Sequence, residues 1–435
     1  MTKSEIVHKI EACIPDTILK IYRNTKQKSK RYIRWKHQQI AYSTAISRVR
    51  QKESPLNVVF IVSDSSEWKY DSLYLLMDKD SYFNPTILVC PMIVYYTEEQ
   101  AYDIFSRTYE FFLKRGYKVS KACENVYDDS INVEAFSPDI IFYSCMWTQY
   151  MHPKYDHMHL RRYLKCYIDY GYCSIVDEWG YSSPFHGLMW RYYTECEDLR
   201  ELALKAQPRE LRNAVVTGYP IFDEYREARG NTTDWKNQDR NFKRVIWAPH
   251  HTIEGRDNLL RFSTFLEVAD FMLDYALKQK TIQFAFKPHP MLLQALYSHP
   301  HWGKEKADAY YKKWEEGDNT SLVTGAYIDL FKSSDAMIHD CGSFIVEYLY
   351  TQKPVMYLGD GREEQSNIVG IKAYRCHYHG NKKDDIKQFV ENVVLKENDT
   401  MKEIRKAFYN EVLLPPNGCS VAENIINDIK HELQK

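Results

Sequence analysis

Three polar residues and a glycine that follow a short apolar run have types and spacing that could bind a nucleotide. Asp340, Gly342 and Ser343 follow the apolar run 336–338, and Glu347 stands four residues beyond Ser343. The run is typical of a buried parallel strand, Gly342 permits an unusual backbone, and Ser343 can cap the next helix. We therefore expect backbone amides there to bind a phosphate, and Glu347, one helical turn on, to accept the hydroxyls of a ribose. The alternative is an ordinary strand-helix-strand crossover with a capped helix.

A lysine and a histidine follow another apolar run. Lys287 directly follows the run 282–286, and His289 stands two residues later, between Pro288 and Pro290. The prolines restrict the backbone, and residues two apart on an extended chain point to the same side. We expect this pair to hold a diphosphate or to stabilise a departing oxygen. The alternative is a loop histidine that bonds to backbone carbonyls.

A histidine pair also follows a predicted strand. His250 and His251 come directly after Pro249. Because successive side chains diverge in direction, at most one of the pair should reach a ligand directly, and we prefer His250. The pair lacks a third ligand at short spacing, and the nearest carboxylate, Glu254, belongs to no cluster, so we predict no metal site.

Three serines follow the first strongly apolar run, 56–62. Ser63, Ser65 and Ser66 offer an N-cap in a loop between a strand and a helix, where acceptor or phosphate contacts are common. A purely structural cap is the alternative interpretation.

The elements that must position these residues form two units. A chain of 435 residues is too long for one ordinary core, and apolar runs alternate with helical patterns in both halves. This pattern predicts two doubly wound α/β domains that face each other across a cleft. We place a basic helical arm at 1–54, an acceptor-side domain at 55–226 and a nucleotide-donor domain at 227–435, whose last helix could pack back on the first domain.

The N-terminal segment differs in charge from the rest of the chain. Residues 1–52 carry thirteen Lys or Arg against three Asp or Glu, whereas the remainder carries 45 against 56. Apolar residues interleave with these bases, which suits an anionic membrane surface. They are Ile21, Tyr22, Tyr32, Ile33, Trp35, Ile40, Ala41, Tyr42, Ala45 and Ile46. A solvated arm or oligomerisation helix is one alternative. Nucleic acid is the other, but we predict no nucleic-acid partner because the body of the chain is acidic and has no nucleic-acid-binding signature.

Cysteine usage and hydropathy indicate the compartment. The ten cysteines include no CxxC pair, which is typical of buried thiols in a reducing cytosol. We see neither a signal-peptide core nor an apolar window of about 18 residues, the length that a membrane span needs. We therefore expect a cytoplasmic protein, peripheral on the cytoplasmic face of the cell membrane.

Several landmarks stand in a familiar order. They are Gly-Tyr-Pro at 218–220, Val-Ile-Trp-Ala-Pro-His-His at 245–251, Phe-Lys-Pro-His-Pro at 286–290, the segment 335–348 and Lys-Pro-Val-Met-Tyr at 353–357. Together they resemble the CDP-glycerol glycerophosphotransferase family, the GT-B-fold polymerases and primases of teichoic-acid and related capsule synthesis. The resemblance covers about residues 160–360 and is strongest after 240.

The resemblance implies roles for the residues named above, with one departure. Family members usually carry a Trp-His-Gly-Thr-Pro-like segment whose histidine is the proposed base, whereas this chain has Tyr-Ile-Asp-Tyr-Gly-Tyr at 167–172, which puts Asp169 in that place. Asp340 could orient Ser343 or a cytidine hydroxyl, although a structural role is equally open because a carboxylate repels a diphosphate. The expected catalytic residues are His250, His289 and Asp169. The expected donor-binding residues are Lys287, Asp340, Gly342, Ser343, Phe344 and Glu347, and the acceptor-side residues are Ser63, Ser65, Ser66 and Tyr172.

The expected function is a transferase that moves a glycerol-phosphate or related polyol-phosphate unit from a CDP-activated donor to a lipid-linked or growing surface polymer. No separate cofactor is expected, and neither a divalent ion nor an oligomeric state is predicted. One alternative is an enzyme of the same shape that uses a nucleotide sugar, either an inverting glycosyltransferase or an epimerase. The other is a non-catalytic scaffold in capsule assembly.

Overall fold

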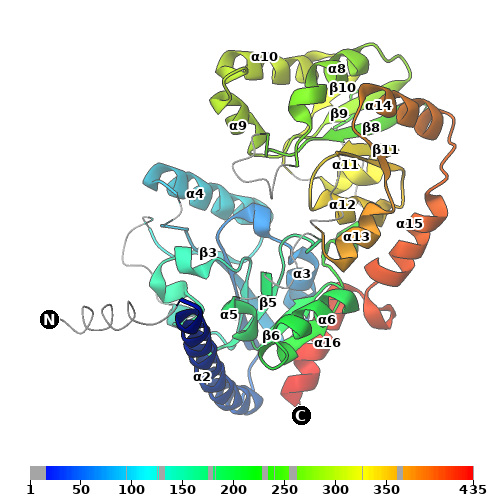
Figure 1. The fold of residues 1–435 in the computed structure, drawn as a ribbon. Coiled ribbons are helices and arrows are strands. Elements are labelled where there is room, and N and C mark those ends of the chain that lie inside the picture. The colour runs from blue at the N-terminus through cyan, green and yellow to red at the C-terminus, as the bar shows by residue number, and fades with distance from the viewer. Residues whose placement is uncertain are drawn as a thin grey trace.

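The chain forms two α/β lobes, each built around one parallel sheet (Figure 1). The computed structural model describes residues 16–434 except 95, 125, 127–132, 175–179, 182, 228–233, 240, 254–261, 326 and 360–365, with side chains from 28 onward. Residues 1–15 of the predicted basic arm lie outside the described residues. The two parallel sheets with their covering helices confirm the predicted doubly wound α/β class.

The first sheet has seven strands in the order β3-β2-β1-β4-β5-β6-β7. The strands are β1 (Leu56–Val62), β2 (Phe83–Val89), β3 (Val119–Lys121), β4 (Ile140–Tyr143), β5 (Leu164–Ile168), β6 (Arg191–Thr194) and β7 (Ala214–Val216). The sequence of β1 is almost continuously apolar because both of its faces are covered. Phe60 packs into one core cluster and Ile61 into another on the opposite face.

The second sheet has six strands in the order β10-β9-β8-β11-β12-β13. These are β8 (Lys243–Ala248), β9 (Ile282–Phe286), β10 (Thr320–Leu322), β11 (Ala336–His339), β12 (Val355–Leu358) and β13 (Tyr378–Gly380). Trp247 of β8 packs into one cluster, whereas its neighbour Ile246 packs into the cluster of the opposite face. As in the first sheet, helices therefore bury both sides of the central strands.

Helices connect the strands and cover both sheets. In the first lobe these are α2 (Asp16–Arg50), the 3-10 turn η1 (Ser65–Glu67), α3 (Asp71–Lys79), α4 (Glu98–Lys114), α5 (Pro184–Gly187), α6 (Glu197–Ala206) and α7 (Ile221–Arg226). The second lobe has α8 (Phe265–Leu277), α9 (Leu292–Ser298), α10 (Gly303–Glu316), α11 (Ile328–Ser333), α12 (Phe344–Glu347), η7 (Tyr348–Thr351), α13 (Ile368–Tyr374), α14 (Lys383–Gln388) and α15 (Lys402–Phe408). The last helix in sequence is α16 (Val421–Gln434). Helices α14 and α15 continue as π-helical turns, η9 (Phe389–Leu395) and η10 (Tyr409–Leu413).

Each sheet has one point where the strand order reverses. In the first sheet this point lies between β1 and β4, and in the second between β8 and β11. In open parallel sheets the loops at such a switch point diverge to opposite faces and leave a crevice at the carboxyl ends of the strands. Loops from the two carboxyl edges meet, because the Ser174 hydroxyl donates to the Gly342 carbonyl at 3.0 Å. Both switch points are therefore the places to look for bound ligands.

The last helix belongs to the first lobe in space (Figure 1). Helix α16 packs against α3 and α2, and the Asp223 carboxylate of α7 accepts the amides of Val421 and Ala422 at 2.9 Å each. Gly218 permits this approach, because its φ of +92° lies in the left-handed region and a Cβ there would meet Pro415 and Val421 at 3.0 Å.

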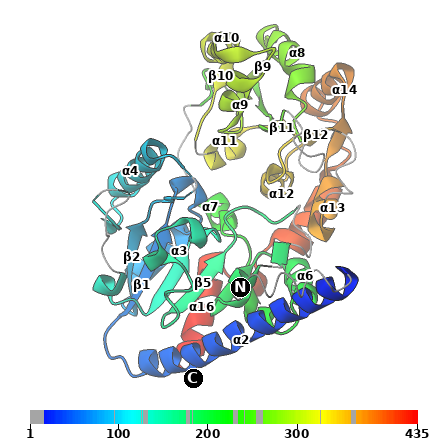
Figure 2. The ribbon, with the colours of Figure 1, turned by 60° about the vertical axis from the view of Figure 1, so that its left-hand side comes forward.

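Helix α2 runs along the base of the first lobe (Figure 2). Tyr42 and Ala45, which we expected against a membrane, are instead buried in the first lobe, and the Tyr42 hydroxyl donates to the Leu188 carbonyl at 2.6 Å. That part of the prediction is wrong, because the domain covers this face of the helix. Ile33 and Ile40 remain on the outer face, 53% and 60% exposed.

Two further features are the cysteines and the hydropathy of the helices. The nine cysteines in the described part of the chain are free thiols, and most are buried. Within the same residues, we find no helix with the length and apolar character that crossing a bilayer requires.

Candidate functional site

The switch point of the second sheet gathers most of the predicted donor-side residues. His250 and His251 follow β8, Lys287 and His289 follow β9, and Asp340 follows β11. The His289 ring centre lies 4.9 Å from that of His250 and 4.1 Å from that of His251. Adjacent parallel strands thus bring together two histidine segments that are far apart in sequence.

The Asp340 carboxylate holds the loops of this site. It accepts the His250 amide at 2.5 Å, and it accepts both the amide and the hydroxyl of Thr264 at 2.7 and 3.0 Å. The side chain is buried. Asp340 therefore fixes the start of α8 and the backbone of His250, while a contact with a cytidine hydroxyl stays a prediction.

The hydrogen bonds of two histidines fix which ring nitrogen carries the proton. The Met291 amide donates to Nδ1 of His289 at 3.1 Å, and the Thr252 amide donates to Nδ1 of His250 at 3.4 Å. The Thr252 hydroxyl lies 2.9 Å from the same His250 atom. Since a neutral imidazole has one donor and one acceptor nitrogen, Nε2 is the protonated atom in both rings. Both histidines can therefore donate one hydrogen bond from Nε2.

Burial favours the uncharged form of the His289 and His251 rings. It lowers the pKa of His289 to about 3, with smaller contributions from His251 and Lys287, and it also lowers the pKa of His251. Burial likewise lowers the pKa of Lys287, which is 5% exposed. Neutral N–H donors beside a lysine form an environment suited to an anion.

The third histidine reopens the question of a metal. One nitrogen from each of His250, His251 and His289 lies within 4.8 Å of the others, so the missing third ligand comes from the next strand rather than from nearby sequence. We predicted no metal site because a third ligand is missing nearby in sequence, and that reason was wrong. The protonation pattern still opposes a metal, because a ligating histidine must offer a lone pair and normally donates from its other nitrogen. In His250 and His289 that other nitrogen accepts from a backbone amide instead.

Two lysines from different lobes share one aromatic ring. The Lys287 ammonium lies 6.0 Å from the centre of the Tyr327 ring, and the Lys69 ammonium from the first lobe lies 5.6 Å from it. Sequence reasoning missed both Lys69 and Tyr327, which belong to no motif. Two cations on one ring between the lobes provide charge suited to a diphosphate.

Glu347 lies at the hydroxyl end of this ring. Its carboxylate accepts the Tyr327 hydroxyl at 2.5 Å and the Tyr219 hydroxyl at 3.1 Å, and it is 2% exposed. Burial raises its pKa, while Lys69 and the two tyrosines act in the opposite direction. Because both oxygens already have partners, its contact with a ribose stays a prediction.

The turn at Ser343 differs from the expectation. Ser343 is exposed and precedes α12, but its side chain makes no capping hydrogen bond, because its backbone is already helical with φ −72° and ψ −37°. The predicted cap is therefore wrong. The α-helix is a single turn, Phe344–Glu347, that passes into the 3-10 turn η7. Phe344 packs edge-on against Phe331, with ring centres 5.0 Å apart, and its contact with a donor stays a prediction.

The switch point of the first sheet carries an acidic residue that the sequence analysis missed. The hydroxyls of Ser63 and Ser144 donate to Oε2 of Glu67 at 2.5 and 3.1 Å. Burial raises the pKa of Glu67 to about 7, opposed by the Ser63 hydroxyl and reinforced by Asp64. Asp64 caps η1 by accepting the Ser66 amide at 2.8 Å. Glu67 lies only one residue beyond the predicted serines.

These residues line a cavity of about 150 Å³. Its walls are Ser63, Asp64, Ser66, Glu67, Pro91, Met92, Tyr96, Ala101, Ile104 and Tyr170. Ser65, the third predicted serine, instead donates its amide to the Thr108 hydroxyl. Tyr172 is buried against Tyr219, with ring centres 5.2 Å apart. The cavity thus includes Ser63 and Ser66 but neither Ser65 nor Tyr172.

Asp169 lies after β5 in a buried polar group. It accepts the Tyr192 hydroxyl at 2.6 Å, and the His186 ring lies 3.9 Å away. Glu195 after β6 comes close to it, and burial followed by the Asp169 charge raises the pKa of Glu195 to about 8. Asp169 is only 7% exposed, so a role as base stays a prediction.

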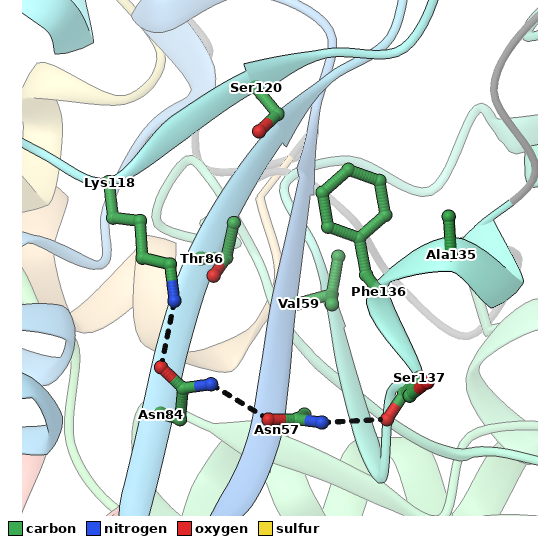
Figure 3. A pocket seen from close by; sticks show the side chains of 9 residues that line it. All are labelled: Asn57, Val59, Asn84, Thr86, Lys118, Ser120, Ala135, Phe136 and Ser137. Atoms are coloured by element: carbon green, nitrogen blue, oxygen red, sulfur yellow. Dashed lines mark hydrogen bonds between the residues drawn. The ribbon is translucent and has the colours of Figure 1, made fainter.

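A larger cavity of about 270 Å³ lies near the amino ends of β1 and β2 (Figure 3). A chain of hydrogen bonds crosses it from Lys118 through Asn84 and Asn57 to the Ser137 carbonyl. Because it lies away from the carboxyl ends where the predicted residues gather, we do not assign it to the site.

Comparisons with known proteins address family and fold. A family model described as CDP-Glycerol:Poly(glycerophosphate) glycerophosphotransferase matches residues 192–429. No curated protein sequence matches the chain. Among solved structures, the chain is similar to a variant of the wall teichoic acid polymerase TagF, with TM-score 0.55, 13% identity, and coverage of 96% of this chain and 99% of that chain.

The chain is also similar to two solved structures whose names mention UDP or a UDP-sugar. A putative UDP-N-acetylglucosamine 2-epimerase from Listeria monocytogenes gives TM-score 0.55 at 14% identity, covering 88% of this chain and 97% of that chain. S. aureus MnaA, solved with UDP, gives TM-score 0.53 at 12% identity, covering 87% of this chain and 97% of that chain. At these identities the likeness shows the fold alone, and the chain has the predicted GT-B architecture.

Proposed function

Because the chain belongs to the CDP-glycerol:poly(glycerophosphate) glycerophosphotransferase family, we propose that it transfers a polyol-phosphate unit, such as glycerol phosphate, from a CDP-activated donor. The acceptor would be a hydroxyl of a lipid-linked or growing polymer of the teichoic-acid or capsular type. The observation that carries the proposal is the meeting of Lys287 with the Nε2–H donors of His250 and His289 at a sheet switch point. These groups suit a diphosphate, and the switch point is where such folds bind nucleotides.

In this proposal the second lobe holds the donor. Lys287 and Lys69 neutralise the diphosphate, and the Nε2–H groups of His250 and His289 donate to its oxygens. In the reaction an acceptor oxygen attacks the β-phosphorus while the bond to the CMP oxygen breaks, so negative charge moves to the departing CMP. The same donors would stabilise that charge. Because Nε2 of His250 carries its proton, this histidine suits the leaving group better than the role of base.

The exposed basic face of α2 suggests where the enzyme acts. Lys30, Arg34 and Lys36 are exposed on the outer face of α2, next to Ile33 and Ile40. Such a face suits an anionic membrane, worth about 1 kcal/mol for each basic residue near the surface. We propose that α2 holds the enzyme on the cytoplasmic side of the membrane, beside its lipid-linked acceptor.

Nucleotide binding tests the donor site directly. We expect CDP to stabilise the full chain against heat, and Lys287→Met and His289→Asn each to weaken CDP binding by about tenfold or more, the range for charge-assisted hydrogen bonds. The matched controls Lys278→Met and His301→Asn alter exposed residues of the same lobe and should bind CDP like the wild type. CMP release from CDP-glycerol, but not UMP release from a UDP-sugar, is the expected turnover. Tighter binding of UDP than CDP, or no loss in either variant, would contradict the proposal.

A further inference from the structure

The cavity beside η1 has one polar wall and one apolar wall. Ser63, Ser66 and Glu67 supply hydroxyl and carboxylate groups, while Met92 and Ile104 lie among the apolar residues. Its volume of about 150 Å³ is smaller than that of pockets for drug-sized ligands, which begin at about 300 Å³. A site of this size and lining suits a short polyol, whose C–H groups contact one wall while its hydroxyls bond to the other.

The charges of the cavity exclude a phosphate. Two carboxylate side chains, Asp64 and Glu67, line it, and no lysine or arginine is among its described lining residues. Like charges in a partly buried site repel, so a phosphate would be disfavoured there. The cations Lys69 and Lys287 lie outside it, at the Tyr327 ring. The ligand class is therefore an uncharged, hydroxyl-bearing end of a chain.

Glu67 is oriented for proton transfer. Its Oε2 accepts the Ser63 hydroxyl at 2.5 Å and the Ser144 hydroxyl at 3.1 Å, from the ends of two adjacent strands. These hydrogen bonds hold Oε2 in place and so orient the carboxylate in the lining of the cavity. A carboxylate positioned in this way is a candidate general base.

Two connections join this cavity to the donor side. Lys69 follows Glu67 by two residues and reaches the Tyr327 ring, which Lys287 also approaches. On the other wall, the Tyr219 hydroxyl lies 3.2 Å from the Tyr170 carbonyl and 3.1 Å from Glu347. Residues that line the cavity or directly follow its lining are therefore linked to the predicted diphosphate site through Lys69, Tyr219 and Tyr327.

We propose that this cavity binds the terminal polyol of the acceptor and that Glu67 removes the proton of its attacking hydroxyl. The inference rests on the proposed function and deepens it. As the acceptor oxygen forms its bond to the β-phosphorus, its proton passes to the Glu67 carboxylate, and the phosphorus–oxygen bond to CMP breaks. CMP leaves with the electron pair, and Glu67 then returns the proton to solvent. The net reaction converts acceptor and CDP-polyol into extended acceptor, CMP and one proton.

The electrostatic setting agrees with this role. A base operates best when its pKa lies near the working pH, and burial raises that of Glu67 to about 7. The titratable groups that face it are Asp64, the Cys145 thiol and Tyr170. Burial raises the pKa of both Cys145 and Tyr170 above their ordinary values of 9.0 and 10.0, so both are neutral when Glu67 titrates.

The test measures acceptor binding and turnover separately in the full chain. The probes are CDP-glycerol as donor and a short poly(glycerol phosphate) with a free terminal hydroxyl as acceptor. For Glu67→Gln we expect kcat to fall by about 10²–10⁴, the range for loss of a general base. The dissociation constant for CDP should stay within about twofold of the wild-type value. A tenfold change, which corresponds to about 1.4 kcal/mol, is not expected. Wild-type kcat should rise with pH through about 7, and the variant should lack that rise.

A second variant tests the cavity without relying on catalysis. The larger side chain in Met92→Trp fills the cavity. We therefore expect the poly(glycerol phosphate) acceptor to bind at least about tenfold more weakly, which corresponds to a loss of about 1.4 kcal/mol. CDP binding should be unchanged. Glu99→Gln, on the exposed side of α4, is the matched control and should behave like the wild type. Unchanged kcat in Glu67→Gln, or unchanged oligomer binding in Met92→Trp, would overturn the inference. If CDP still binds in that case, the proposed donor site remains supported. A wild type that binds the oligomer but not CDP would overturn the proposed function instead.

Discussion

Replacing Glu67 by glutamine should change how stability depends on pH. Glu67 is largely buried, and its pKa is raised from 4.5 to about 7. At about 1.4 kcal/mol for each tenfold change in proton affinity, this shift corresponds to a penalty of about 3 kcal/mol on the ionised form. The folded state binds the proton more tightly than the unfolded state does. Its contribution is therefore fully present below pH 4.5 and is lost as pH rises through about 7.

Glutamine keeps the shape and an acceptor oxygen for Ser63 and Ser144 but cannot ionise. We expect Glu67→Gln to gain up to about 3 kcal/mol relative to the wild type between pH 4.5 and 8, with little further change above that. Urea unfolding of the wild type, Glu67→Gln and the exposed control Glu99→Gln at pH 5, 6, 7 and 8 measures this difference. If wild type and Glu67→Gln give parallel curves across that range, Glu67 titrates in the native state as it does in the unfolded chain, and the burial argument is refuted.

Two further predictions concern the ends of the chain. Asp223→Ala removes the carboxylate that accepts two amides at the start of α16, and it should cost about 1–3 kcal/mol in urea unfolding because buried donors lose their partner. Asp78→Ala, on an exposed side of α3, should cost much less, and equal losses in both variants would argue against the Asp223 contact. Joint replacement Lys30→Glu, Arg34→Glu and Lys36→Glu should abolish binding to anionic vesicles, as sedimentation at low salt would measure. Unchanged sedimentation of that variant would disprove the membrane role of α2.

Local sequence patterns predicted the sheets well, because buried parallel strands are read from short apolar runs. The runs at 56–62, 282–286 and 336–338 all lie in the strands of the structure. The strands β3, β6, β10 and β13 were missed, since each has only three or four residues and none carries a continuous aliphatic run. The Ser343 cap failed for a different reason: the residue type permits a cap, but the backbone at that position is already helical.

The site was harder to predict because it depends on which strands are neighbours. His250 and His289 were each recognised after a strand, but only the pairing of β8 with β9 places their rings 4.9 Å apart. Lys69 and Tyr327 come from different lobes, and no local spacing relates them. Glu67 could have been found, since it directly follows the predicted serines at the end of β1, and a carboxylate at a switch point is a signal in itself.

The return of α16 to the first lobe means that the polypeptide passes between the lobes twice, once after α7 and once between η10 and α16. The carboxylate of Asp223 ties these two passages together, because it lies on α7 and holds the first amides of α16. Because this contact joins α7 to α16, the start of α16 is held to the first lobe and not to the second. Any change in the distance between the lobes would therefore separate Lys69, which moves with α16, from Lys287, and the charge that the two ammonium groups share at the Tyr327 ring would be divided.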